Sequence, residues 1–211
     1  MGSLTISIAI CGCGPGAREY VTPTVEQAVS EATVIAGAPR LLDLFPDSNA
    51  RRIPLEGSLD VWISRLVDTV NERIAVLVTG DAGCCSLATR VIAKFGRDRC
   101  RVIAGISSVQ VACAKLGLSW ENARIIRAHA TLPKVGVTEL EPCDPWIILM
   151  CAQGAEQMVA DMAQNSGRDC YVCENLTLAS ERMMKLASDA LALLSTHPRR
   201  IVVLTRKFEN E

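Results

Sequence analysis

The sequence predicts an α/β protein composed of two α/β domains, residues 1–118 and residues 119–211. Apolar runs alternate with amphipathic segments through the first half of the chain, which is typical of βαβ units and a parallel sheet. Three of these runs lead into loops that contain glycine, at Gly12, Gly80 and Gly105. After Leu118-Ser119-Trp120 the pattern starts again, which indicates a second α/β domain.

Length and composition limit the class of protein. The chain has 211 residues, of which 49% are hydrophobic, enough to bury a core in each domain. The net charge of −1 and the pI near 6.2 give no overall basic surface for nucleic acid or for an acidic membrane. No basic segment followed by a long apolar run marks a secretory signal, and no apolar run reaches 18 residues. We therefore expect a cytoplasmic protein without a nucleic-acid or membrane partner.

Parallel strands and helices account for the first half. Thr22 followed by Pro23 is a favoured helix start, because the threonine caps the helix and proline fits its first position. Gly117 is expected to end a helix over 107–116. The strands are expected at 5–11, 32–36, 50–53, 74–79 and 101–104. Two helical stripes are expected to face the core: Val25, Ala28, Val29 and Ala32, and Leu59, Trp62, Ile63, Leu66, Val67 and Val70.

The second half predicts strands at 124–127, 146–151, 170–174 and 200–205. Helices are expected at 154–164 and 179–194. The second of these is amphipathic through Met183, Leu186, Ala187, Ala190 and Leu194.

The loop after the first strand does not fit a dinucleotide site, although Gly12, Gly14 and Ala17 satisfy G-x-G-x-x-[GA]. The next helix start is Thr22, too far from the glycines for a helix N-terminus to meet a pyrophosphate. The acidic residue expected after the second strand is also missing, since 32–42 contain no carboxylate. The loop stays compatible with a nucleotide-like ligand without a pyrophosphate, of which S-adenosylmethionine is the commonest.

Two further loops lie at expected strand ends. Asp81, in Gly80-Asp81-Ala82-Gly83, is either the cap of the following helix or a carboxylate near a ligand. Ser107 and Ser108 allow the same two interpretations. A serine-hydrolase elbow is excluded here because the second glycine of G-x-S-x-G is missing.

The cysteines do not predict a metal centre. Ten cysteines are a smaller share of the chain than in a disulfide scaffold, and thiols of this kind are ordinary core residues. Cys170 and Cys173 lie three residues apart on an expected strand, so their side chains point to opposite faces. We expect no metal to be bound.

Taken together, the motifs resemble those of the tetrapyrrole (corrin and porphyrin) methylase family, and most nearly its corrin C5-methyltransferase branch. The first loop, Gly12-Cys-Gly-Pro-Gly16, and the second, Gly80-Asp81-x-Gly83, correspond to family motifs. So do Gly105-Ile-Ser-Ser-Val, leading to Gly117-Leu-x-Trp120, and Cys173-Glu-Asn-Leu-Thr177, leading to Glu181-Arg182. Two departures are Ala82, where the family carries proline, and Ala130-Thr131, where this branch carries Gly-Arg.

The resemblance implies S-adenosylmethionine in a cleft between two α/β domains, with S-adenosylhomocysteine as product. It further implies C5 methylation of a corrin-ring precursor in cobalamin biosynthesis and a homodimer. A decarboxylating C15-methylase is the expected partner or fused enzyme. Carried over by position, the cofactor contacts are Cys13, Gly14, Asp81, Gly83, Cys84, Ser107, Ser108, Val109, Met150, Cys151, Asn175 and Leu176. The residues expected to bind the substrate's carboxylates are Arg18, Arg40, His129 and Lys134.

This chemistry asks for orientation more than for side-chain catalysis, and the sequence identifies no general base. Gly14 is expected to lack a side chain because backbone and cofactor meet there. Three alternatives stay open: a non-catalytic adenosyl-binding module, a diphthine synthase of the same superfamily, and a dehydrogenase.

Overall fold

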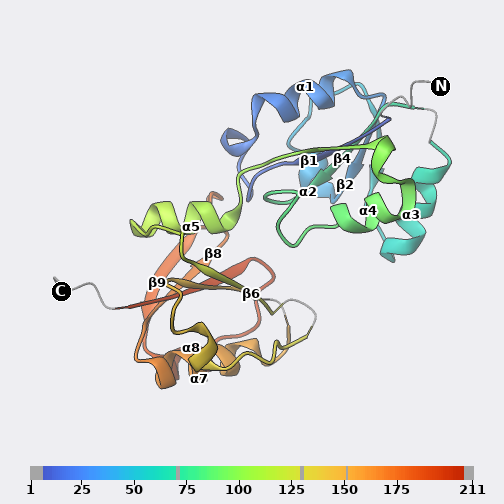
Figure 1. The fold of residues 1–211 in the computed structure, drawn as a ribbon. Coiled ribbons are helices and arrows are strands. Elements are labelled where there is room, and N and C mark those ends of the chain that lie inside the picture. Colours follow the sequence, from blue (N-terminus) through green and yellow to red (C-terminus); the bar gives the residue numbers. More distant parts are fainter. Residues whose placement is uncertain (1–6, 70–71, 129–130, 151, 207–211) are drawn as a thin grey trace. The chain divides into compact units, whose positions relative to one another are not determined.

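The computed structural model describes residues 7–69, 72–128, 131–150 and 152–206. The chain divides into two compact units, Met1–Ser107 and Ser108–Glu211 (Figure 1). The predicted boundary after residue 118 differs from this division, because the helix that follows Ser107 is grouped with the second unit.

The first unit holds a five-stranded sheet of order β3-β2-β4-β1-β5 in which every pairing is parallel, as predicted. Its strands are β1 (Ile8–Gly12), β2 (Val34–Gly37), β3 (Arg51–Pro54), β4 (Ile74–Val78) and β5 (Cys100–Ile103). Its helices are η1 (Arg18–Tyr20), α1 (Pro23–Glu31), α2 (Pro39–Leu42), α3 (Leu59–Val67), α4 (Ala88–Phe95) and η2 (Arg97–Arg99). The Thr22 hydroxyl accepts a hydrogen bond from Val25 N, so the predicted cap of α1 is confirmed.

The helices of this unit cover both faces of the sheet (Figure 1). Ile8 and Ile10 of β1 pack with α3 and α4, whereas Cys11 packs with α1 and α2. The neighbouring strands β1 and β4 therefore send their following helices, α1 and α4, to opposite faces. Such a divergence leaves a crevice at the carboxyl ends of the two strands, where open α/β sheets bind ligands.

Most of the predicted core stripe of α3 is confirmed, with Trp62, Ile63 and Leu66 buried. The prediction is wrong for Val67, which is 39% exposed at the end of the helix. Val70 lies outside the described residues.

The second unit has a mixed sheet of order β6-β7-β10-β8-β9. Only β6 and β7 pair in parallel, and β10 runs antiparallel between β7 and β8. The strands are β6 (Arg124–Ala128), β7 (Trp146–Met150), β8 (Asp169–Glu174), β9 (Arg182–Leu186) and β10 (Arg200–Thr205). The helices are α5 (Ser108–Leu116), α6 (Val137–Leu140), α7 (Ala155–Ser166) and α8 (Ser188–Ala192). α7 and α8 cover one face of this sheet and α5 contacts β10 on the other (Figure 1).

The predicted helix over 179–194 is wrong. Arg182–Leu186 instead forms β9, which pairs antiparallel with β8, and only Ser188–Ala192 is helical. The alternate residues Met184 and Leu186 pack against the core of the sheet. Strand pairing therefore partly buries apolar residues whose spacing suggested a helix.

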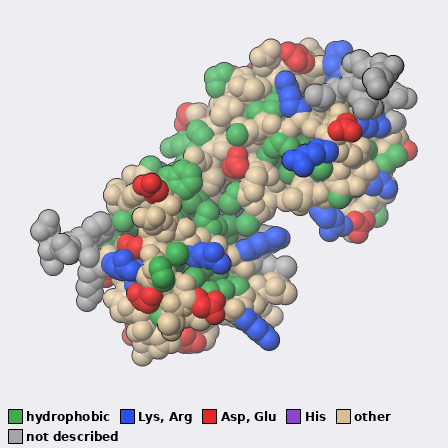
Figure 2. Space-filling model, viewed as in Figure 1, with side chains coloured by type: hydrophobic (Ala, Val, Ile, Leu, Met, Phe, Trp, Pro, Cys, Tyr) green, Lys and Arg blue, Asp and Glu red, His purple; other side chains and the backbone are tan. Residues whose placement is uncertain are grey.

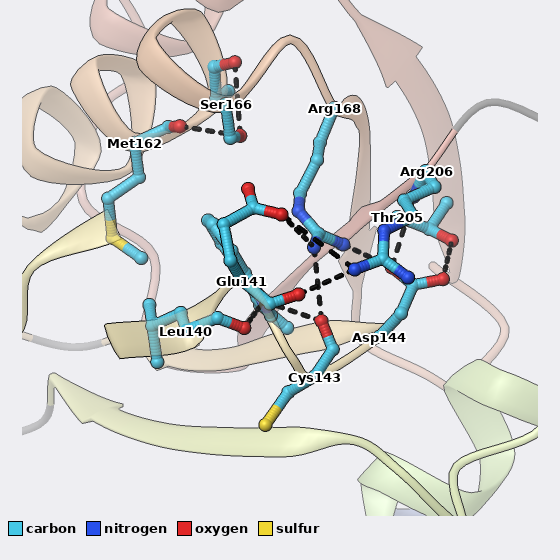
Figure 3. A network of polar contacts seen from close by, with 11 residues as sticks. Leu140, Glu141, Cys143, Asp144, Met162, Ser166, Arg168, Thr205 and Arg206 are labelled. Carbon is cyan, nitrogen blue, oxygen red and sulfur yellow. Dashed lines mark hydrogen bonds and ion pairs between the residues drawn. The ribbon is translucent and has the colours of Figure 1, made fainter. Parts of the chain in front are cut away.

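A network of polar contacts fastens the end of the second sheet at which β7 and β8 begin (Figure 3). The Arg168 side chain is only 2% exposed and forms an ion pair with Asp144. Its guanidinium also donates to Cys143 O at 3.0 Å and lies 4.0 Å from the centre of the Trp146 ring. The Asp144 carboxylate further accepts hydrogen bonds from Thr205 Oγ1 at 3.3 Å and Arg206 N at 3.1 Å. This network joins β7, β8 and β10 at the end opposite to Met150 and Glu174.

Among the described residues, no helix has the length and apolar character needed to cross a bilayer. Figure 2 shows acidic and basic side chains interspersed over the visible face of each unit, in line with the net charge of −1.

We expect Asp144→Ala to destabilise the second unit by about 3 kcal/mol, because it removes the closest counter-charge of a buried arginine. Arg90→Met is the control, since Arg90 and Asp60 form an ion pair between exposed side chains that is worth about 0–1 kcal/mol. Urea unfolding measures both variants. Equal losses would contradict a special role for the Arg168 network.

Candidate functional site

The glycine loops after β1, β4 and β5 touch one another through their backbones. A Cβ built on Gly105 would lie 2.2 Å from Gly12 O and 2.5 Å from Gly80 O. A Cβ on Gly12 would lie 2.6 Å from Gly105 N. Because atoms at these distances overlap, the three loops can approach this closely only with glycine at both positions. The crevice end of the sheet is therefore built from main chain.

The first loop is joined to the second by a short antiparallel bridge. Gly80 N donates to Gly14 O at 2.8 Å, and Gly14 N donates to Gly80 O at 3.3 Å. Cys13 N donates to Val78 O at 2.9 Å. The N–H groups of Cys13 and Gly14 are therefore engaged by carbonyl groups of β4 and of the loop that follows it.

Gly14 has structural reasons to lack a side chain. Its φ is +75°, a region that favours glycine, and a Cβ would lie 2.8 Å from Tyr20 O. The expected reason, an approach of the cofactor, stays a prediction beside these two.

Asp81 fastens the second loop to the third. Its Oδ1 accepts a hydrogen bond from Gly83 N at 2.8 Å, and its Oδ2 accepts one from Gly105 N at 2.9 Å. The helix-cap interpretation of Asp81 is wrong, because α4 begins at Ala88 after Leu87 and has no side-chain cap. The carboxylate instead holds two glycine loops together at the crevice.

The two expected cysteine contacts of the first unit differ in exposure. Cys13 is fully buried in the core beside α1 and α2, and burial raises the pKa of its thiol. Cys84 is half-buried. Burial is the main cause that raises the pKa of its thiol, and the neighbouring Cys85 raises it further. Cys13 therefore has only backbone to offer a ligand.

In the second unit, the expected contacts occupy three segments: the start of α5, the turn after β8 and the end of β7. Ser108 and Val109 begin α5, with Val109 buried; Ser107, just before the helix, belongs to the first unit and is buried as well. Asn175 and Leu176 form the turn after β8. Met150 ends β7 with its side chain in the core under α7, so only its backbone is available. Cys151 lies outside the described residues.

The turn after β8 carries an unsatisfied polar atom. Asn175 Oδ1 is buried and has no hydrogen-bond partner among the described residues, while its Nδ2 donates to Ser180 O at 3.5 Å. A buried acceptor without a donor is costly, and such groups concentrate at binding sites. Asn175 also has a φ of +49° and Thr177 a φ of +70°, both rare for residues other than glycine.

A buried charge network supports this turn. The Glu174 side chain is 1% exposed, and Arg200 Nη2 lies 2.7 Å from Glu174 Oε1. Arg182 Nε donates to Glu174 Oε2 at 3.1 Å, and Arg200 Nη1 donates to Glu156 Oε1 at 3.1 Å. Burial acts to raise the pKa of Glu174, but the hydrogen bonds from Arg182 and Arg200 outweigh it and hold the pKa below its usual value. The network fixes the ends of β8, β9 and β10 beside Asn175.

Cys170 and Cys173 face opposite sides of the sheet, as predicted. Cys170 packs in the core with α7, whereas Cys173 lies near Cys113 of α5. Burial raises the pKa of each of the two thiols to about 12. The described ranges contain no cluster of three or more histidine, cysteine or acidic residues suited to a metal ion.

The expected substrate-binding residues fall in different places. Arg40 of α2 donates to Thr79 Oγ1, which places it beside the end of β4. Arg18 is held by Glu26 at 3.2 Å and by Leu44 O, and stacks over Phe45. Lys134 is exposed in the loop before α6. His129 lies outside the described residues.

Comparisons with known proteins agree with the motifs and the fold. The model of the family described as Tetrapyrrole (Corrin/Porphyrin) Methylases matches residues 7–192. The chain belongs to this methylase family.

Two curated relatives carry the same activity in their names. The probable cobalt-precorrin-7 C(5)-methyltransferase of Methanocaldococcus jannaschii is 38% identical over 58% of this chain, which spans only 60% of that protein. The cobalt-precorrin-7 C(5)-methyltransferase of Salmonella typhimurium is 28% identical over 87% of this chain and 92% of its own length.

Solved structures share the two-domain α/β fold. The precorrin-6Y methylase of Archaeoglobus fulgidus is 26% identical, with a TM-score of 0.71 over 97% of this chain and 100% of that one. Uroporphyrin-III C-methyl transferase from Thermus thermophilus, complexed with S-adenyl homocysteine, has a TM-score of 0.73 at 17% identity over 94% and 91% of the two chains.

The sequence did not predict how this turn is supported. Glu174 and Arg182 belong to a recognised motif but were assigned no role, and Arg200, which pairs with Glu174, lies outside every motif. A basic residue at the start of an otherwise apolar strand, Arg200-Ile-Val-Val-Leu-Thr205, was the available signal.

We expect Gly105→Ala to destabilise the first unit by at least about 3 kcal/mol, because the added methyl overlaps the backbone of Gly12 and Gly80. Gly117→Ala is the matched control. Its φ is +67° and nothing lies within 4 Å of its Cβ position, so only backbone strain of about 1–2 kcal/mol is expected. Urea unfolding compares the two, and a loss at Gly105 no larger than that at Gly117 would refute the close packing.

Asp81→Ala is expected to destabilise the first unit by about 2 kcal/mol, because Gly83 N and Gly105 N lose the carboxylate that accepts their hydrogen bonds. Hydrogen exchange at these two amides should rise while exchange in β2 stays unchanged. Unaltered exchange at Gly105 would show that the loops hold together without Asp81.

Proposed function

We propose that this chain transfers a methyl group from S-adenosylmethionine to C5 of a corrin-ring precursor, a cobalt-precorrin or a precorrin, in cobalamin biosynthesis. The observation that most supports this proposal is the backbone contact of three glycine loops at one sheet edge, in a chain whose residues 7–192 match the methylase family. The names of the relatives from Methanocaldococcus and Salmonella support the choice of ring carbon.

The residues present fit such a cofactor. The carboxyl edge of the sheet offers main chain from the loops of Gly14, Asp81 and Gly83, and glycine lets a ligand approach the backbone closely. Asn175 Oδ1 is buried without a partner in the part of the chain that the structure describes, and the amino groups of the cofactor are donors that would satisfy it. The other proposed contacts are Cys13, Cys84, Ser107, Ser108, Val109, Met150, Cys151 and Leu176.

The task of the protein in this reaction is to bind and align. The bound cofactor supplies a methyl group already activated on a sulfonium sulfur. That methyl would pass to the ring carbon as the carbon–sulfur bond breaks, with S-adenosylhomocysteine as product and the positive charge of the sulfonium taken up by the conjugated ring. Holding the two reactants in line is worth up to about 7–11 kcal/mol, so the chain needs no side-chain nucleophile.

Binding of the substrate's carboxylates is proposed for Arg40, Lys134 and His129, since arginine and lysine pair well with carboxylates. Arg40 has the best support because it lies beside the end of β4. Arg18 is the weakest of the four expected residues, because Glu26 and Leu44 O already engage its guanidinium. A cytoplasmic homodimer completes the proposal.

The decisive experiment is incubation with methyl-labelled S-adenosylmethionine and corrin intermediates, with and without ring cobalt. Mass spectrometry should show one labelled methyl on the ring, and NMR should place it at C5. Absence of label from every corrin would refute the proposed activity. Label on a modified protein histidine would identify a diphthine synthase instead.

We expect S-adenosylhomocysteine to bind in calorimetry and NAD to show no binding. Asn175→Gly should weaken S-adenosylhomocysteine about tenfold, because it removes the acceptor while glycine keeps the positive φ. Asn165→Ala, an exposed residue of α7, is the control and should bind normally. Tight NAD binding would overturn the choice of cofactor.

A further inference from the structure

The turn from Asn175 to Thr177 has a conformation that needs outside support. Two of its residues, Asn175 at φ +49° and Thr177 at φ +70°, occupy the left-handed region, and Thr177 is β-branched. Such residues persist there only when surrounding contacts fix them. The hydrogen bonds from Leu178 N to Asn175 O and from Glu181 N to Leu178 O, both 2.9 Å, carry the chain back toward β9.

Glu181 makes the contact that holds the strained residue. Its Oε2 accepts a hydrogen bond from Thr177 N at 2.5 Å. Its Oε1 accepts one from Lys115 Nζ of α5 at 2.7 Å. The hydrogen bond from Lys115 holds the pKa of Glu181 below its usual value, so the carboxylate is charged at neutral pH. The Glu181 side chain is 23% exposed and thus partly shielded from water.

These two bonds join the segments that matter for the proposed cofactor. Lys115 belongs to the helix that begins with Ser108 and Val109, and Thr177 directly follows Leu176. One carboxylate therefore ties the helix to the turn that presents Asn175 Oδ1.

We propose that Glu181, bridged to Lys115, is a positioning residue for cofactor binding, which fixes the Asn175–Thr177 turn against α5. The inference rests on the proposed function. Glu181 acts through the turn. It sets the positions of Asn175 and Leu176 and does not itself contact the reacting atoms.

Calorimetry with S-adenosylhomocysteine on the full chain tests the proposal. Glu181→Ala should weaken binding about tenfold, because the turn loses a charge-assisted hydrogen bond that the bound state needs. Glu181→Gln keeps an acceptor for Thr177 N and should restore most of the affinity. Lys115→Met should weaken binding by a smaller factor, since the carboxylate remains but loses its anchor on α5.

Lys185→Met is the matched control. Lys185 and Asp169 form an ion pair at 3.1 Å between β9 and β8, so its loss perturbs the same strand pair away from the turn. The melting temperature of the Lys185→Met protein should fall, while its affinity for S-adenosylhomocysteine should stay at the wild-type value.

The outcomes separate the two proposals. Failure of the wild-type chain to bind S-adenosylhomocysteine would refute the proposed function. Normal binding by the wild type and equally by Glu181→Ala would overturn the role of Glu181, as would equal weakening by Lys185→Met. Should Glu181→Ala not fold, Lys115→Met decides: wild-type affinity in Lys115→Met would then overturn the bridge.

Discussion

The close approach of Gly12 to Gly105, with Gly80 O between them, is the constraint on which the first unit depends. Strands β4, β1 and β5 lie side by side, and their carboxyl ends can meet only where no side chain separates them. Asp81 then fastens what the glycines allow, by accepting hydrogen bonds from Gly83 N and Gly105 N. Local sequence at three distant positions thus produces one surface made of main chain.

In the second unit, the turn after β8 is positioned by buried ion pairs and not by close contacts between glycines. Its sheet is fastened at one end by Arg168 with Asp144 and at the other by Glu174 with Arg200. Both arginine side chains are almost fully buried, and each is matched by carboxylates. Buried pairs of this kind restrict strand position more surely than they add stability. That precision suits an end of the sheet which carries a turn with two left-handed residues.

The sequence was most informative where a physical pattern is local. Apolar runs predicted all five parallel strands of the first unit, and Thr22-Pro23 predicted the start of α1. It was least informative where pairing partners decide. The apolar residues from Met183 to Leu194 have helical spacing. Residues 182–186 nevertheless form a strand, because they pair with the edge of β8. Asp81 likewise has the chemistry of a helix cap, but Gly105 N, which is 24 residues away, engages its carboxylate. Contacts across such distances leave no periodicity in one sequence.

Ala82 stands where the resembling family carries proline, and the consequence concerns temperature. Proline stiffens a loop by limiting the conformations of the unfolded chain, an entropic effect that does not weaken on warming. Here the Asp81 carboxylate helps to order the loop through hydrogen bonds, which are an enthalpic contribution. This loop should therefore loosen on heating earlier than one stiffened by proline. The temperature at which this loop loosens then depends in part on two hydrogen bonds.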